Sequence, residues 1–85
     1  MNYVYILECA DGSYYTGWTN SLSKRIKTHS AGKGAKYTRS RLPVRLIYRE
    51  KHPTPTDARK REAQIKKLTR EEKELLIERH KNTDT

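Results

Sequence analysis

The N-terminal part of this 85-residue chain is rich in tyrosine, whose hydroxyl can exchange a proton or bind a ligand. Four of the six tyrosines lie between residues 3 and 15, in a chain that has no phenylalanine. A buried phenol needs a hydrogen-bond partner. These tyrosines therefore indicate either a polar site or an unusual core.

The turn between Tyr5 and Tyr15 decides whether their side chains lie on one face. Two aromatic and β-branched runs flank an Asp-Gly turn signal, which predicts a β-hairpin over residues 3–17. A two-residue loop would place the two phenols on opposite faces, because side chains alternate along a strand. A three-residue loop with Gly12 in the left-handed region would instead pair Tyr5 with Gly17. We favour this second loop, because it gathers both phenols beside a bare glycine.

A glutamate interrupts the apolar stripe of a predicted helix. Glu62 follows Ala58 at helical spacing and precedes Ile65 and Thr69, with Leu68 alongside. A carboxylate that faces a core is costly unless it is paired or binds a metal. It could be a metal ligand, the partner of a buried arginine, or an ordinary surface charge.

An earlier helix, predicted from residue 20 or 21 to about residue 30, presents a basic pair. Arg25 and His29 are four residues apart and share one face of this helix. They lie next to an inward stripe formed by Leu22, Ile26 and either His29 or Ser30.

Residues 30–43 form a predicted loop rich in glycine and basic residues. Basic side chains can bind phosphates, and an interleaved aromatic ring could stack on a base. The alternative is a solvated surface loop. The candidate nucleic-acid-binding residues are Lys33, Lys36, Tyr37, Arg39 and Arg41.

The overall charge favours a nucleic-acid partner. The formal net charge is +9 and the pI is about 9.9, which is typical of proteins that bind nucleic acid. An anionic membrane is the rival partner, but no apolar run approaches the roughly 18 residues of a membrane span. We expect no secretory signal, because the N-terminus has no basic region leading into an apolar one. Cys9 is the only cysteine and can form no internal disulfide, so we expect a cytoplasmic location.

The remaining elements complete a small domain. We predict a strand over residues 44–50, a helix over 58–68 capped by Thr56 or Asp57, and a further helix that begins with a capping box at Thr69. In the strand, Leu46 and Tyr48 alternate with Arg45, Ile47 and Arg49. The predicted fold is α/β (α+β), a small three-stranded antiparallel sheet flanked by helices. It should be one domain over residues 1–80 with a disordered tail at 81–85.

These residues together resemble the GIY-YIG nuclease domain, and most closely its small stand-alone bacterial members. The resemblance covers essentially residues 2–78. It depends on an ordered set in which Tyr5, Tyr15 and Arg25 are equally spaced, followed by His29 and Glu62. In Tyr15-Thr16-Gly17, which corresponds to the YIG of the family name, threonine stands in place of isoleucine.

The resemblance implies a metal-dependent DNA endonuclease, structure-selective and acting in DNA repair or processing. Tyr5 would take a proton from water, assisted by Tyr15 and His29. Arg25 would bring the pKa of that phenol toward neutrality and bind the phosphate. Glu62 would hold Mg²⁺ or Mn²⁺.

Gly17 is implied as a structural residue beside these groups. The set should line one concave face of the domain. The alternative function is a nucleic-acid-binding module whose catalysis is vestigial.

Overall fold

The computed structural model describes residues 1–83, with side chains described to residue 81. Its elements follow one another in the order β1 (Asn2–Glu8), β2 (Tyr14–Thr19), α1 (Leu22–Ser30), α2 (Lys36–Arg39), β3 (Arg45–His52), α3 (Pro55–Lys66) and α4 (Arg70–Thr83).

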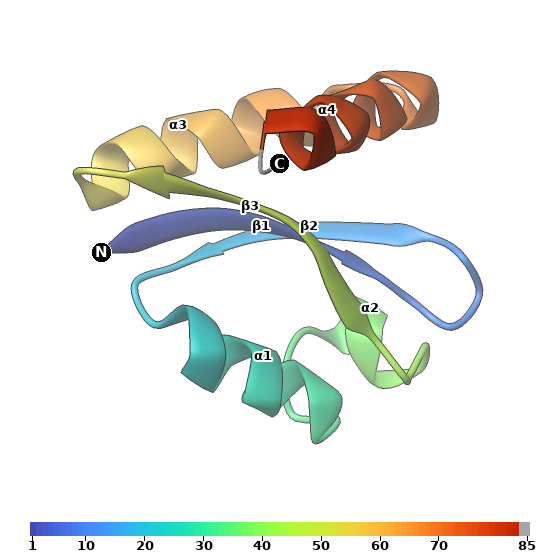
Figure 1. Cartoon of the computed structure of the whole chain (residues 1–85). Coiled ribbons are helices and arrows are strands. Elements are labelled where there is room, and N and C mark those ends of the chain that lie inside the picture. Colours follow the sequence, from blue (N-terminus) through green and yellow to red (C-terminus); the bar gives the residue numbers. More distant parts are fainter. Residues whose placement is uncertain (84–85) are drawn as a thin grey trace.

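A three-stranded antiparallel sheet in the order β2-β1-β3 lies between two helical layers. Helices α3 and α4 lie over one face of the sheet, and α1 and α2 lie over the other (Figure 1). The predicted fold class is therefore confirmed. No helix in the described residues is long and apolar enough to cross a membrane.

The β1–β2 hairpin has the predicted three-residue turn. The Cys9 N–H donates to the Ser13 carbonyl at 2.8 Å, and Gly12 has a φ of +82°. Tyr5 consequently pairs with Gly17 across the two strands. This register places the Tyr5 and Tyr15 side chains on the same face of the sheet.

The apolar core lies between the sheet and the α3/α4 layer. Val4 and Ile6 on β1 are fully buried there, against Ala58 and Ile65 of α3 and Ile77 of α4. Because side chains alternate along β1, Tyr5 points to the opposite face, toward α1.

A bulge in β3 breaks the expected alternation of that strand. Ile6 pairs with Tyr48, but the next residue, Leu7, pairs with Leu46 and leaves Ile47 as an extra residue. A bulge of this kind shifts the strand by one position. Tyr48 therefore packs in the α3/α4 core, while Leu46 lies on the other face, opposite Leu7. The sequence pattern had predicted that Leu46 and Tyr48 share a face, which is wrong.

The helix boundaries differ from the prediction at α3. This helix begins at Pro55, three residues earlier than expected, because proline is well suited to the first helical position. Thr54, rather than Thr56 or Asp57, is the cap, and its Oγ1 accepts the Asp57 N–H at 3.1 Å. The helix ends at Lys66.

Helices α2 and α4 also differ from the prediction. The 30–43 segment contains the short helix α2, where only a loop was expected. The predicted capping box at Thr69 and Glu72 opens α4, with reciprocal bonds of 2.9 and 3.2 Å. Helix α4 continues to Thr83, so it includes residues 81–83 of the expected tail, and residues 84–85 lie outside the described part.

Candidate active site

A buried chain of hydrogen bonds joins β1 to α1 and α2. The Tyr5 hydroxyl lies 2.9 Å from Nε2 of His29, and His29 Nδ1 lies 2.9 Å from Oγ1 of Thr38. Thr38 Oγ1 in turn donates to the Ala35 carbonyl at 3.0 Å. Tyr5 is 1% exposed, and His29 and Thr38 are fully buried. The phenol therefore has the partner that its burial requires, and His29 is the inward residue of α1 rather than Ser30.

Two glycines make room for this chain. A Cβ at Gly17 would lie 2.6 Å from the Tyr5 hydroxyl oxygen, and a Cβ at Gly34 would lie 2.3 Å from His29 Nδ1. Real side chains do not approach so closely. Gly17 on β2 and Gly34 in the loop before α2 therefore let the backbone close around the two rings.

A row of aromatic rings leads outward from this chain. The Tyr15 ring centroid lies 6.5 Å from that of Tyr5 and 5.3 Å from that of His29. Tyr37 on α2 stacks on Tyr15 at 6.1 Å, and the Arg41 guanidinium lies 3.8 Å above the Tyr37 ring. Tyr15 thus forms a wall of the site, and Tyr37 already has a stacking partner in the protein.

The charges of Arg25 and Glu62 affect the pKa values of both Tyr5 and Tyr15. Burial raises the pKa of Tyr5; Arg25 opposes this rise, and the nearby Tyr15 and Glu62 add to it. Burial likewise raises the pKa of Tyr15, against the influence of Arg25. Arg25 thus acts on the Tyr5 pKa in the predicted direction, but burial has the larger effect, so the pKa of Tyr5 lies above its ordinary value. His29 Nε2 is the group within hydrogen-bond distance of the Tyr5 hydroxyl.

Glu62 is a partly buried carboxylate with one weak partner. Its side chain is 20% exposed, beside the fully buried Ala58 and Ile65, and its ion pair with Lys66 is long at 3.8 Å. The described residues contain no cluster of three or more metal-binding side chains. A single carboxylate suits Mg²⁺, which keeps most of its waters and binds jointly to a substrate phosphate. The donor set therefore fits a hydrated Mg²⁺ or Mn²⁺.

The predicted nucleic-acid-binding residues fall into two groups. Lys33, Lys36 and Arg39 are exposed, and their side chains make no hydrogen bond or ion pair within the described part of the chain. Arg41 instead pairs with Asp11 at 3.1 Å and donates to the Tyr37 carbonyl at 2.9 Å, so it holds α2 against the β1–β2 turn.

Charge is segregated around the site. The sequence from Gly12 to Arg49, which includes α1 and α2, contains no acidic residue. Helix α4, in the opposite layer, carries Glu71, Glu72, Glu74 and Glu78. The Tyr5–His29 pair therefore lies in the basic layer of the molecule.

Thr38 and Gly34 are site residues that the sequence prediction did not identify. Both lie in the segment that was assigned to nucleic-acid binding because of its lysines and arginines. No helical or strand periodicity links Thr38 to His29, nine residues earlier. Only the closure of this segment over α1 brings the two together.

Comparison with known proteins agrees with this geometry. The family model described as the GIY-YIG catalytic domain matches residues 1–75. The chain belongs to the GIY-YIG family.

Similar GIY-YIG chains are small bacterial proteins. A UPF0213 protein of Clostridium perfringens is 61% identical over 77 residues, which cover 91% of this chain and 83% of that protein. A UPF0213 protein of Streptococcus sanguinis is 56% identical over 75 residues, covering 88% and 86% respectively.

Two solution NMR structures share the fold of this GIY-YIG chain. A UPF0213 protein from Bacillus halodurans has a TM-score of 0.60 and 52% identity, with 92% of this chain and 84% of that chain covered. A protein from E. faecalis has a TM-score of 0.63 and 44% identity, with coverage of 93% and 84%. GIY-YIG membership points to a nuclease that acts on nucleic acid.

Proposed function

We propose that this protein is a metal-dependent endonuclease that hydrolyses DNA phosphodiester bonds, selects branched, gapped or single-stranded structures, and acts in DNA repair or processing. The observation that carries the proposal is the buried Tyr5–His29 hydrogen bond, placed where the charges of Arg25 and Glu62 act on the same phenol. A Tyr-His pair with neighbouring arginine and carboxylate groups contains the parts that phosphodiester hydrolysis needs.

In the proposed reaction, Tyr5 accepts a proton from the attacking water while its own proton passes to His29 Nε2. The water oxygen forms a bond to phosphorus, and the bond from phosphorus to the leaving oxygen breaks. Burial and the Arg25 charge lower the pKa of His29, so the ring is neutral at pH 7 and free to accept. After cleavage the proton returns through Tyr5 to solvent, and the leaving oxygen takes a proton from water.

Arg25 and Glu62 would help to stabilise the negative charge of the phosphate. Arg25 would donate hydrogen bonds to the phosphate oxygens as negative charge builds up in the transition state. Glu62 would hold Mg²⁺ or Mn²⁺, which neutralises phosphate charge and stabilises the leaving oxygen.

Selection by structure rather than sequence follows from the small basic surface. Lys33, Lys36 and Arg39 are suited to phosphates, which carry no sequence information. A domain of this size also has little surface with which to read base edges.

The test is cleavage of branched, gapped and single-stranded DNA by the purified protein with Mg²⁺ or Mn²⁺, with and without a chelator. We expect slow, chelator-sensitive cleavage. Glu62→Gln and Tyr5→Phe should each lower the rate by about 100-fold or more with little change in DNA binding, because the lost interactions belong to the transition state.

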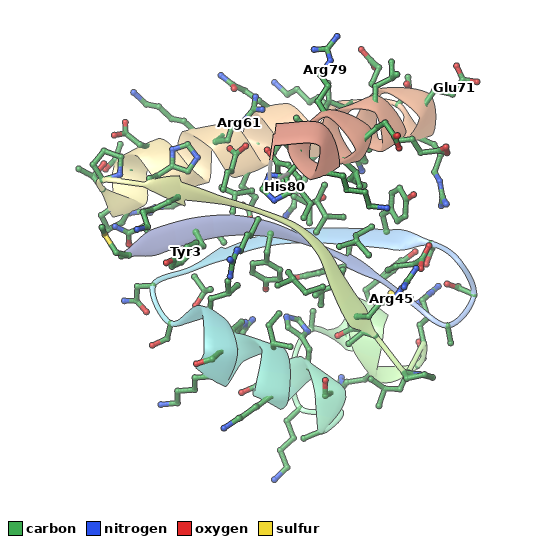
Figure 2. The ribbon with its side chains drawn as sticks, in the orientation of Figure 1. Tyr3, Arg45, Arg61, Glu71, Arg79 and His80 are labelled. Carbon is green, nitrogen blue, oxygen red and sulfur yellow. The ribbon has the colours of Figure 1, made fainter. Side chains whose placement is uncertain are left out.

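Glu71→Gln is the matched control, since Figure 2 shows Glu71 on α4, pointing away from the sheet. It should cleave like the wild type. DNA binding without any cleavage across the panel would favour the alternative, a binding module with vestigial catalysis. Cleavage by Glu62→Gln at the wild-type rate would exclude Glu62 as the metal ligand.

A further inference from the structure

The Thr38 hydroxyl has one hydrogen and two close neighbours. Its Oγ1 lies 3.0 Å from the Ala35 carbonyl oxygen and 2.9 Å from His29 Nδ1. A carbonyl oxygen can only accept, so the hydroxyl hydrogen is used in the bond to Ala35. Thr38 Oγ1 must then accept a hydrogen from His29. The Nδ1 atom of His29 therefore carries the ring hydrogen.

This assignment determines what the other ring nitrogen does. In a neutral imidazole one nitrogen donates and the other accepts. With the hydrogen on Nδ1, His29 Nε2 has a free lone pair, 2.9 Å from the Tyr5 hydroxyl. The bonds then run in one direction, from the Tyr5 O–H to Nε2 and from Nδ1–H to Thr38. The opposite tautomer would set two hydrogens against each other at the Tyr5 bond or leave the phenol without an acceptor.

We propose that Thr38 is a positioning residue that fixes His29 as the Nδ1–H tautomer and so keeps Nε2 ready to accept the Tyr5 proton. Its catalytic consequence rests on the function proposed above, whereas the tautomer itself does not. Thr38 touches neither the phosphate site nor Tyr5 in this arrangement and acts only through His29.

The local structure supports the assignment. Ala35 is the residue that caps α2, and Thr38 lies three residues later, so the bond between them forms within one helical turn. Because the hydroxyl hydrogen is used in this local bond, Thr38 Oγ1 can only accept from the His29 ring. The missing side chain of Gly34 lets the same segment close on the ring, since a Cβ there would lie 2.3 Å from Nδ1. Ring orientation and tautomer are thus controlled by one short segment.

The test compares Thr38→Val, which keeps the shape of the side chain but cannot accept, with Thr38→Ser, which keeps the hydroxyl. Nitrogen-15 NMR of the His29 ring, recorded without DNA, should show Nδ1 protonated in the wild type and in Thr38→Ser. In Thr38→Val the hydrogen should move toward Nε2. Cleavage by Thr38→Val should fall about 10- to 100-fold in kcat with KM unchanged, the size of effect that follows loss of a group orienting a functional histidine.

Thr28→Val is the control on α1. Thr28 Oγ1 also donates to a backbone carbonyl, that of Lys24 at 3.0 Å, but it has no bond to His29. This variant should leave the tautomer and kcat unchanged. A wild-type spectrum with the hydrogen on Nε2 would overturn the proposal, and so would Thr38→Val keeping the Nδ1–H form.

The NMR spectra need no substrate, so they determine the His29 tautomer even if no DNA is cleaved. Absence of cleavage with the expected tautomers would reject the proposed function alone. If Thr38→Val does not fold, the spectra of the wild type and Thr38→Ser still decide the tautomer.

Discussion

At the scale of single residues, the core contains a polar atom without a partner. Thr16 on β2 is 4% exposed, and its hydroxyl makes no hydrogen bond within the described residues. It pairs with Ile6 and so faces the apolar α3/α4 side of the sheet. A buried hydroxyl without a partner lowers stability, because it loses its bonds to water and gains none.

We therefore expect Thr16→Val to raise the free energy of unfolding by about 1 kcal/mol, since valine has nearly the same shape and no hydroxyl. Chemical denaturation measures the change. Thr19→Val is the control, because Thr19 Oγ1 accepts the Ser21 N–H at 3.1 Å and its loss should not stabilise the protein. A less stable Thr16→Val protein would mean that the hydroxyl has a partner.

At the scale of elements, one carboxylate joins α3 to the edge strand β3. Glu50 accepts hydrogen bonds from Tyr48, from His52 Nε2 at 2.8 Å and from Arg61 Nε at 2.7 Å, and it is 19% exposed. Burial raises the pKa of Glu50, but these three bonds outweigh it and hold the pKa below its usual value. Burial, with the Glu50 bond, raises the pKa of Tyr48 to about 12, so Tyr48 remains a donor.

Glu50→Gln should lower the free energy of unfolding at pH 7 by about 1–3 kcal/mol, because it replaces charge-assisted bonds by neutral ones. Since the folded-state pKa of Glu50 lies below the unfolded value, its stabilisation is complete above the unfolded pKa and is lost as pH falls through the folded pKa. Denaturation curves between pH 7 and pH 3 should thus converge for Glu50→Gln and the wild type. Glu71→Gln, on the outer surface of α4 in Figure 2, should match the wild type throughout. A constant gap between the curves would contradict this account.

At the scale of the whole molecule, net positive charge is concentrated in the layer that contains the Tyr5–His29 pair, because no acidic residue there offsets the lysines and arginines. The acid-free sequence from Gly12 to Arg49 forms β2, α1, α2 and the first part of β3, and α1 and α2 lie together below the sheet in Figure 1. Such a surface attracts a polyanion and releases its counterions on binding.

We expect DNA affinity to fall steeply with salt, with a slope on a log–log plot of about 0.9 for each phosphate contacted in duplex DNA. Lys36→Ala and Arg39→Ala should each weaken binding and reduce that slope by about 1. Lys81→Ala, on α4 in the opposite layer, should leave the slope unchanged. Binding titrations over a range of salt concentrations measure this, and a slope that is insensitive to Lys36 and Arg39 would place the DNA elsewhere.

The sequence by itself determined those features that depend on neighbours along the chain. The turn at Gly12 set the hairpin register, and the register placed Tyr5 and Tyr15 on one face beside Gly17. Helical spacing narrowed the inward residue of α1 to His29 or Ser30, and the capping box at Thr69 marked the start of α4. Local backbone geometry and side-chain periodicity suffice for such predictions.

Only the tertiary structure decided the features that depend on residues distant in sequence. The bulge at Ile47 arises from pairing with β1, and it moved Leu46 and Tyr48 to opposite faces. The rise in the Tyr5 pKa depends on how completely the surrounding elements exclude water, which no local pattern encodes. Thr38 meets His29 because a loop closes over α1, and a hydrogen bond between side chains depends on that closure rather than on sequence spacing.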